Sequence, residues 1–287
     1  MEKIIDRPRK KVLVLGNLGY LGRHIQEHLE KTPDLSVRGF EPKGLEESPQ
    51  EALHWCDYCI LCLGLSDHNL GRQDPFLDYD RNLADYLEVL RLPESRGKKF
   101  IYLGSLCQYG VPQGVVTETT PFNPVEPQGL NKAYIEKILE FMAPLNLGSF
   151  CALRLGAVVG GKKDLSNLAL LEKIILTNLE GNLFEVYGGV DRSYACIPLD
   201  TFLLVITAIL KRDHFRNRAY NLSTHNLSFG SLSALLDIKF NDSAKLESHA
   251  VNSDKLFTEL DLKIDLVEAK QLISNLRYEI SKLQNLR

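Results

Sequence analysis

The fold of this chain is decided by Lys11-Val-Leu-Val-Leu15 and by Gly16-Asn-Leu-Gly-Tyr-Leu-Gly22, which follows it directly. The apolar run is typical of a buried parallel strand. Leu21, Ile25 and Leu29 then recur at helical spacing over residues 20–31. Glycines at G-x-x-G-x-x-G spacing between a strand and a helix permit a tight turn that approaches a pyrophosphate. The N–H groups and dipole of the helix N-terminus favour the same anion.

An acidic residue supports a dinucleotide as the ligand of this turn. Glu41 ends the next strand candidate, at residues 35–40. A carboxylate there can accept hydrogen bonds from the ribose hydroxyls and repels a 2′-phosphate, which favours NAD. Arg38 and Lys43 lie nearby, so NADP stays open as the alternative. The predicted cofactor-binding residues of the turn are Gly16, Asn17, Leu18, Gly19, Tyr20, Leu21 and Gly22.

Strands and helices alternate along the first half of the chain, which predicts an α/β fold with a doubly wound parallel sheet of the Rossmann type. The further strand candidates are 58–63, 99–103 and 150–155, and the helix candidates are 80–92 and 131–143. Beyond residue 160 we expect a smaller C-terminal substrate lobe, with helices at 165–179, 201–210 and 266–286 and strands at 184–187 and 219–222. The predicted dinucleotide-binding domain is 1–160 with return segments at about 190–225. The substrate-binding lobe is 161–189 and 226–287.

The composition excludes several classes of protein. The 287 residues carry a net charge of −3, with 25% charged and 44% hydrophobic residues. This is an ordinary globular composition, without a global attraction to nucleic acid or to an anionic membrane. The apolar stretch 202–210 is too short to span a bilayer. The first residues resemble no signal peptide, and six cysteines then suggest reduced thiols in a cytoplasmic protein.

Two spacings invite a metal site, and we predict none. Cys56, Cys59 and Cys62 form C-x-x-C-x-x-C within Trp55–Leu63, which we interpret as a buried strand. Side chains three apart on a strand face opposite sides, so the thiols would not converge. His24 and His28 are four apart on the first helix, but no third ligand is indicated.

Several short motifs follow the glycine turn in a characteristic order. They are Cys62-Leu-Gly64, Asp80-Arg-Asn82, Leu103-Gly-Ser-Leu-Cys-Gln-Tyr-Gly110, Glu118-Thr-Thr-Pro-Phe-Asn-Pro124, Arg154-Leu-Gly156, Arg192-Ser-Tyr-Ala-Cys-Ile-Pro-Leu-Asp200, Tyr220-Asn-Leu-Ser223 and Ser253-Asp-Lys255. This order resembles the extended short-chain dehydrogenase/reductases, in particular the NAD-dependent epimerase/dehydratase group, and the resemblance covers nearly the whole chain. It implies that Leu63 and Gly64 lie in the adenine-side loop and that the protein is a homodimer acting on a small molecule, with sugar nucleotides as the leading class.

This family uses a Y-x-x-x-K pair, in which the lysine lowers the pKa of the tyrosine and holds the nicotinamide ribose. Lys132 matches the lysine, but Gln128 stands at the tyrosine position. Tyr134 does not fit, because Lys137 comes one residue too early. An amide does not exchange a proton at neutral pH, so the usual acid/base route is missing.

By the same resemblance, further catalytic and substrate residues are predicted besides Lys132 and Gln128. Ser105 matches the catalytic hydroxyl, and Cys107 is a candidate thiol in place of an acid, with a structural role as the alternative. Arg192, His68 and Tyr109 are predicted substrate residues, although Ala157 replaces the asparagine usual in sugar-nucleotide members. Two hypotheses follow: an NAD(P)-dependent epimerase/dehydratase-like oxidoreductase with an atypical site, and a catalytically silent dinucleotide-binding relative that acts as a sensor, scaffold or enzyme subunit.

Overall fold

The computed structural model describes residues 9–42, 48–65, 68–112, 114–187, 190–241 and 250–284. The chain forms two compact units. Unit 1 comprises Met1–Gly104, Leu130–Ala152 and Ile209–Ala219, and unit 2 comprises Ser105–Gly129, Leu153–Ala208 and Tyr220–Arg287. The predicted boundaries between the dinucleotide-binding domain and the substrate-binding lobe, at residues 160, 190 and 225, stay a prediction.

A six-stranded sheet with strand order β2-β1-β3-β4-β5-β9 organises unit 1. The pairs β1–β2, β1–β3 and β3–β4 are parallel, which confirms the predicted fold class. The chain moves from β1 to β2 on one side and then to β3 on the other, so a topological switch point lies at the carboxyl end of β1. The strands are β1 (Lys10–Leu15), β2 (Leu35–Phe40), β3 (Tyr58–Leu61), β4 (Lys98–Ser105), β5 (Gly148–Leu155) and β9 (Arg218–Leu222).

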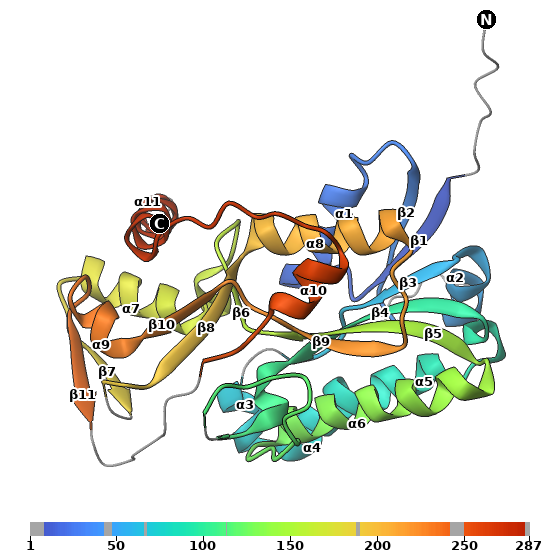
Figure 1. Cartoon of the computed structure of the whole chain (residues 1–287), viewed down its shortest axis with the longest axis horizontal. Coiled ribbons are helices and arrows are strands. Elements are labelled where there is room, and N and C mark those ends of the chain that lie inside the picture. The colour runs from blue at the N-terminus through green and yellow to red at the C-terminus, as the bar shows by residue number, and fades with distance from the viewer. Residues whose placement is uncertain are drawn as a thin grey trace, which may run out of the picture. The chain divides into compact units, whose positions relative to one another are not determined.

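Helices cover both faces of this sheet (Figure 1). Leu13 and Leu15 of β1 pack in one core cluster with Tyr86 and Ile135, whereas Val12 and Val14 are buried on the opposite face. A strand buried on both faces explains the continuous apolar run in the sequence. The helices are α1 (Tyr20–Leu29), α2 (Pro49–Trp55), α3 (His68–Gln73), α4 (Pro75–Tyr79), the π-helical segment η1 (Asp80–Ala84), α5 (Asp85–Leu90) and α6 (Pro127–Met142), the last of which begins in unit 2.

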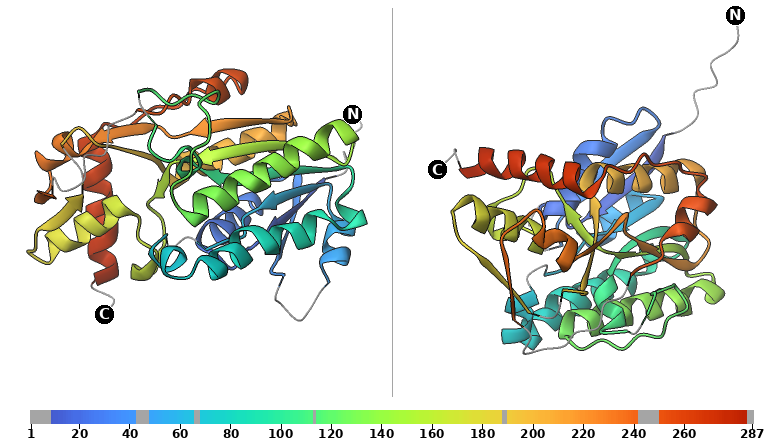
Figure 2. Two further views of the ribbon diagram at one scale, coloured as in Figure 1. Left: turned by 90° about the horizontal axis from the view of Figure 1, so that it is seen from below. Right: turned by 60° about the vertical axis from the view of Figure 1, so that its left-hand side comes forward.

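Unit 2 contains a three-stranded sheet of order β10-β8-β6 and the parallel pair β11–β7. Helices α7 and α11 pack over its core (Figure 2). Its strands are β6 (Ala157–Val159), β7 (Phe184–Tyr187), β8 (Ser193–Pro198), β10 (His225–Ser228) and β11 (Ile238–Asn241). Its helices are the 3-10 turns η3 (Leu106–Tyr109) and η5 (Leu165–Asn167), then α7 (Leu170–Leu179), α8 (Leu199–Arg212, which ends in unit 1), α9 (Phe229–Ser233), α10 (Asp254–Glu259) and α11 (Ala269–Gln284).

Several element boundaries differ from the predictions for local reasons. The helix expected from residue 165 begins at Leu170, because the Glu172 carboxylate accepts a hydrogen bond from the Ala169 N–H and caps the helix there. The final helix begins at Ala269 instead of residue 266. The helix expected over 80–92 is interrupted by the π-helical segment Asp80–Ala84. None of the helices in the described ranges is long and apolar enough to cross a bilayer.

The interpretation of Trp55–Leu63 as one strand is wrong. The segment starts with the end of α2, and Cys56 precedes β3 and packs in the same core cluster as Cys59. Burial raises the pKa of Cys56 to about 11 and that of Cys62 to about 12, so these thiols stay protonated at neutral pH. Within the described part of the chain, no group of three His, Cys, Asp or Glu residues could hold a metal ion.

Candidate functional site

The glycine-rich turn connects β1 to α1 at the switch point of the sheet. Gly16 has a φ of +85°, and a Cβ there would lie 2.9 Å from the Cys62 carbonyl oxygen. A Cβ on Gly22 would lie 2.1 Å from the Gly16 carbonyl oxygen, so the helix reaches the turn only because this residue is glycine. Gly19 is the N-cap of α1 and offers no side-chain cap. The first helical N–H groups have no intrahelical acceptor and are suited to an anion.

The other predicted residues of this turn lie around it. Asn17 donates a hydrogen bond from Nδ2 to Gln26 Oε1 (3.1 Å), and Leu18 is exposed. The ring of Tyr20 packs edge-on against His24. Leu21 begins α1 beside Tyr20 and is half-buried.

Glu41 directly follows β2 and is half-buried. The Arg38 guanidinium lies over the Trp55 ring, 4.5 Å from its centroid, so one of the two cations near Glu41 is held by an aromatic ring. Lys43 lies outside the described residues. This arrangement suits a ribose with free hydroxyls better than one with a 2′-phosphate.

Lys132 is buried in unit 1, and its ammonium group is surrounded by oxygen atoms. Nζ donates to Leu63 O (3.3 Å), Tyr86 OH (3.1 Å) and Leu103 O (3.2 Å). The Tyr86 hydroxyl itself donates to Leu63 O. Burial raises the pKa of Tyr86 well above its usual value, so this phenol stays protonated and acts as a hydrogen-bond donor.

A polar cradle lies beside this lysine. Gly64 has a φ of +128°, and a Cβ there would lie 2.3 Å from Asn82 Oδ1 and 3.3 Å from Lys132 Nζ. Asn82 Oδ1 is buried and has no hydrogen-bond partner among the described residues. A buried acceptor next to an ammonium donor fits hydroxyl groups, which both donate and accept. The cradle is therefore compatible with the ribose of a dinucleotide.

Gln128 contacts Cys107 in unit 2. The Cys107 thiol donates to Gln128 Oε1 at 3.9 Å; Gln128 is buried and Cys107 is half-buried. Ser105 is the N-cap of η3: its Oγ accepts from the Cys107 N–H (3.2 Å), and its own N–H donates to Gln108 Oε1 (2.9 Å). The predicted serine, thiol and amide thus come together, but the serine hydroxyl already serves the backbone of this turn.

The placement of Tyr109 does not favour the predicted substrate contact. Tyr109 is 1% exposed, its hydroxyl donates to Asn221 Oδ1 (2.6 Å), and Arg154 Nη1 donates to that hydroxyl. Asn221 N–H in turn donates to Glu118 Oε1 (3.1 Å). These four residues form a polar network within unit 2, and the substrate contact of Tyr109 stays a prediction.

Of the two remaining predicted substrate residues, the structure describes the side chain of Arg192 but not that of His68. Arg192 is half-buried, and its guanidinium lies 5.7 Å from the centroid of the Phe229 ring. His68 begins α3, but its side chain lies outside the described part of the chain.

The sequence reasoning missed Tyr86 as the partner of Lys132. Tyr86 stands four residues after Asn82, so the two share one face of the helical segment. This spacing could have indicated that Tyr86 lies near Asn82. It could not indicate the contact with Lys132, because the two residues are 46 apart in the chain.

The chain is similar in sequence to a known protein family and to a characterised relative. The sequence model of the NAD dependent epimerase/dehydratase family matches residues 12–223. The UDP-glucose 4-epimerase of Lactobacillus helveticus is 25% identical over 261 residues, which cover 75% of this chain and 76% of that protein.

Two solved structures show the same fold. The UDP-N-acetylglucosamine 4-epimerase of Methanobrevibacter ruminantium M1, in complex with UDP-N-acetylmuramic acid, superposes with a TM-score of 0.79 at 19% identity and covers 98% of this chain and 100% of its own. The UDP-glucuronic acid 4-epimerase of Bacillus cereus, in complex with NAD, gives a TM-score of 0.81 at 17% identity, covering 96% and 97%.

Proposed function

Because the chain belongs to the NAD dependent epimerase/dehydratase family, we propose that it is an NAD(P)-dependent epimerase/dehydratase-like oxidoreductase with an atypical active site. Its proposed substrate is a small molecule, with sugar nucleotides as the leading class. One observation carries the proposal: Gly16 and Gly22 bring the backbone of the turn and the open N-terminus of α1 to the switch point of the sheet. The names of the relatives, which are epimerases of UDP-sugars, support the substrate class.

The residues present fit a dinucleotide. The turn at Gly16–Gly22 would hold the pyrophosphate, Glu41 the adenosine ribose, and Gly64 with Asn82 and Lys132 a second set of hydroxyls. When bound, the nicotinamide ring supplies a site that accepts and returns a hydride. Glu41 would disfavour the 2′-phosphate of NADP by charge repulsion.

In the proposed reaction, no tyrosine hydroxyl acts as the acid or base, because Gln128 stands at the predicted position of the family's tyrosine. Ser105 and the Gln128 amide would orient a substrate oxygen by hydrogen bonding. The proton would be carried by the Cys107 thiol or by a water molecule. Ser105, Cys107, Gln128 and Lys132 thus keep the proposed catalytic roles, and Arg192 and His68 keep proposed substrate contacts.

A second candidate function is a catalytically silent relative that binds the dinucleotide as a sensor, scaffold or enzyme subunit. Two observations favour it. Gln128 is bonded to Cys107, and the Lys132 ammonium has a protein acceptor for each of its three N–H donors. Such a lysine stabilises the fold without any substrate.

Mass spectrometry of the purified, denatured protein is expected to detect NAD, and calorimetry is expected to show tighter binding of NAD than of NADP. The expected ratio is about tenfold, from repulsion between Glu41 and the 2′-phosphate. Glu41→Gln should narrow this ratio, whereas Glu27→Gln, a change on α1 outside the turn, should leave it intact. Absence of both dinucleotides, together with no calorimetric binding, would refute the proposal.

The natural protein is expected to exchange hydride with a UDP-sugar. Gln128→Tyr is expected not to increase the rate of this exchange, because the Gln128 amide oxygen already accepts a hydrogen bond from the Cys107 thiol. If the thiol carries the proton, Cys107→Ser should lower kcat about a hundredfold. Tyr134→Phe, on the helix that also carries Gln128, is the matched control for the Gln128 variant and should be neutral. An inactive natural protein that gains activity through Gln128→Tyr would instead establish the silent relative.

The predicted homodimer stays a proposal. It is supported by an exposed apolar row in unit 1 with Leu130, Tyr134 and Phe141 on α6 and Phe76 on α4. A stripe of this kind on a helix indicates a protein–protein contact. The cytoplasmic location is likewise a prediction from the sequence.

A further inference from the structure

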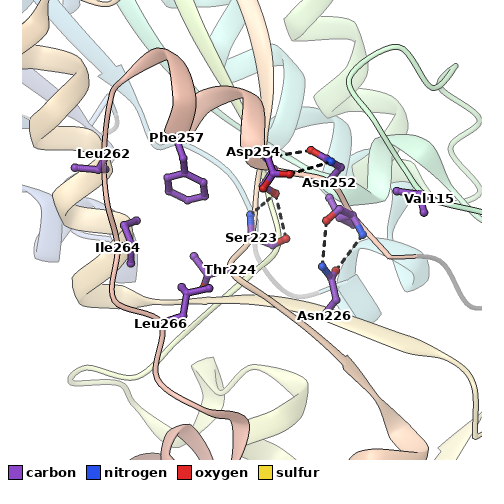
Figure 3. A pocket seen from close by; sticks show the side chains of 12 residues that line it. Val115, Ser223, Thr224, Asn226, Asn252, Asp254, Phe257, Leu262, Ile264 and Leu266 are labelled. Carbon is purple, nitrogen blue, oxygen red and sulfur yellow. Dashed lines mark hydrogen bonds between the residues drawn. The ribbon is translucent and has the colours of Figure 1, made fainter.

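Unit 2 contains a pocket of about 450 Å³, and none of its described lining residues is proposed above for the dinucleotide or the chemistry (Figure 3). It lies between the turn after β9, the stretch that leads into α10, and the segment that joins α10 to α11. Small-molecule sites in proteins have volumes of roughly 300 to 1,000 Å³. The pocket is therefore large enough for a ligand with one aromatic ring.

One wall of the pocket is apolar. Leu262, Ile264 and Leu266 alternate with polar residues, and all three line the pocket together with Phe257 of α10. This alternation is what an extended segment produces when one of its faces is covered. The connecting segment 262–266 thus presents an apolar face to the pocket.

The connecting segment is attached at both ends. The Leu262 N–H donates to Phe257 O (2.9 Å). At the other end, His225 Nε2 lies 2.9 Å from Val267 O. A carbonyl only accepts, so Nε2 carries the hydrogen, and Nδ1 accepts from the Thr224 hydroxyl (2.9 Å). These anchors hold the apolar wall in place without a ligand.

The opposite wall is polar and is already paired internally. Asn226 Nδ2 donates to Val251 O (3.1 Å) and its Oδ1 accepts from the Val251 N–H (3.0 Å). The Ser223 N–H donates to Ser253 Oγ (3.0 Å). Asn252 Nδ2 donates to Asp254 Oδ2 (3.2 Å). This wall is rigid and does not require a ligand to satisfy its polar groups.

Among the described residues that line the pocket, Asp254 carries the only formal charge. Its neighbour Lys255 does not line the pocket, because its ammonium lies over the Tyr220 ring, 5.5 Å from the centroid. A carboxylate at the rim repels carboxylates and phosphates and attracts ammonium groups. This charge disfavours anionic ligands in the pocket.

We propose that this pocket binds a small amphipathic cation, with an aromatic or branched aliphatic body against Phe257, Ile264 and Leu266 and a protonated amine at Asp254. The apolar wall would supply most of the affinity through burial of the ligand body. The carboxylate would supply the selectivity for a positive charge. This site does not depend on the proposed enzymatic function.

Three probes of nearly equal size test the charge preference: 2-phenylethylamine, 2-phenylethanol and phenylacetate, each titrated into the full chain and followed by amide NMR. The amine is expected to bind in the millimolar range, about tenfold more tightly than the alcohol, with shifts confined to residues 223–226 and 251–266. Phenylacetate is expected not to bind. Equal affinities for the three probes, or shifts outside these residues only, would overturn the proposal.

Variants test the two walls separately. Asp254→Asn should remove the tenfold preference for the amine and leave the alcohol unchanged. Asp265→Asn is the matched control, because Asp265 is exposed on the connecting segment and does not line the pocket. Ile264→Ala should weaken the amine and the alcohol equally, by about threefold. Unchanged amine binding in Asp254→Asn, or an equal loss in both aspartate variants, would contradict the assignment; urea unfolding confirms that each variant is folded.

Discussion

Replacing Gly22 with alanine is expected to abolish dinucleotide binding and to lower the free energy of unfolding by about 3 kcal/mol. The new Cβ would lie 2.1 Å from the Gly16 carbonyl oxygen and 2.9 Å from Asn17 Cα. Both contacts are with backbone atoms, so no side chain can rotate away. The N-terminus of α1 must move from the turn, and its N–H groups then no longer converge on one anion.

Gly19→Ala is the matched control for this experiment. A Cβ at Gly19 would lie 3.4 Å from the same carbonyl oxygen, which is an ordinary contact, and the φ of −69° suits alanine. We expect its free energy of unfolding to stay within about 1 kcal/mol of the natural protein. Urea unfolding and NAD calorimetry on both variants distinguish packing from binding. Unfolding of Gly22→Ala at the same urea concentration as Gly19→Ala would contradict this prediction. It would show that the close approach of α1 to the turn does not require glycine at position 22.

Replacing Lys163 with methionine is expected to lower the free energy of unfolding by about 3 to 5 kcal/mol. Lys163 Nζ lies 2.6 Å from Glu172 Oε2, and both side chains are almost completely buried. The Glu172 carboxylate also accepts from the Gly160 and Ala169 N–H groups. Without the ammonium, this carboxylate would be a buried charge without its counter-ion, in unit 2.

The ion pair as a whole is expected to contribute little, because burial lowers the pKa of Lys163 and thus offsets the attraction by Glu172. The double variant Lys163→Met with Glu172→Gln should therefore recover most of the loss. Lys162→Met, at an exposed neighbouring position, is the control and should change the free energy by less than about 1 kcal/mol. A double variant as unstable as Lys163→Met alone would show that the loss comes from packing and not from the unpaired carboxylate.

The sequence predicted the features that depend on neighbouring residues. The strand, the glycine turn and the helix follow one another within residues 11–29, so the apolar run and the glycine spacing were sufficient to locate them. The alternation of strands and helices likewise predicted the parallel sheet. The errors occurred where a single polar contact decides a boundary, as with Glu172 at the start of α7, or where a short apolar run such as Trp55–Leu63 combines two elements.

The tertiary structure alone decided which side chains meet. Lys132 is bonded to Tyr86 and to the carbonyl groups of Leu63 and Leu103, and Tyr109 is bonded to Asn221, 112 residues further along the chain. Periodicity reports which face of an element is buried, but not which distant element covers it. The residue types in the sequence therefore predicted a dinucleotide-type turn and a glutamine, Gln128, at the position of the family's tyrosine. Only the packing of distant segments decided that the Cys107 thiol donates a hydrogen bond to Gln128, that the Tyr109 hydroxyl meets Asn221 and Arg154, and that the segment before α11 lines a pocket.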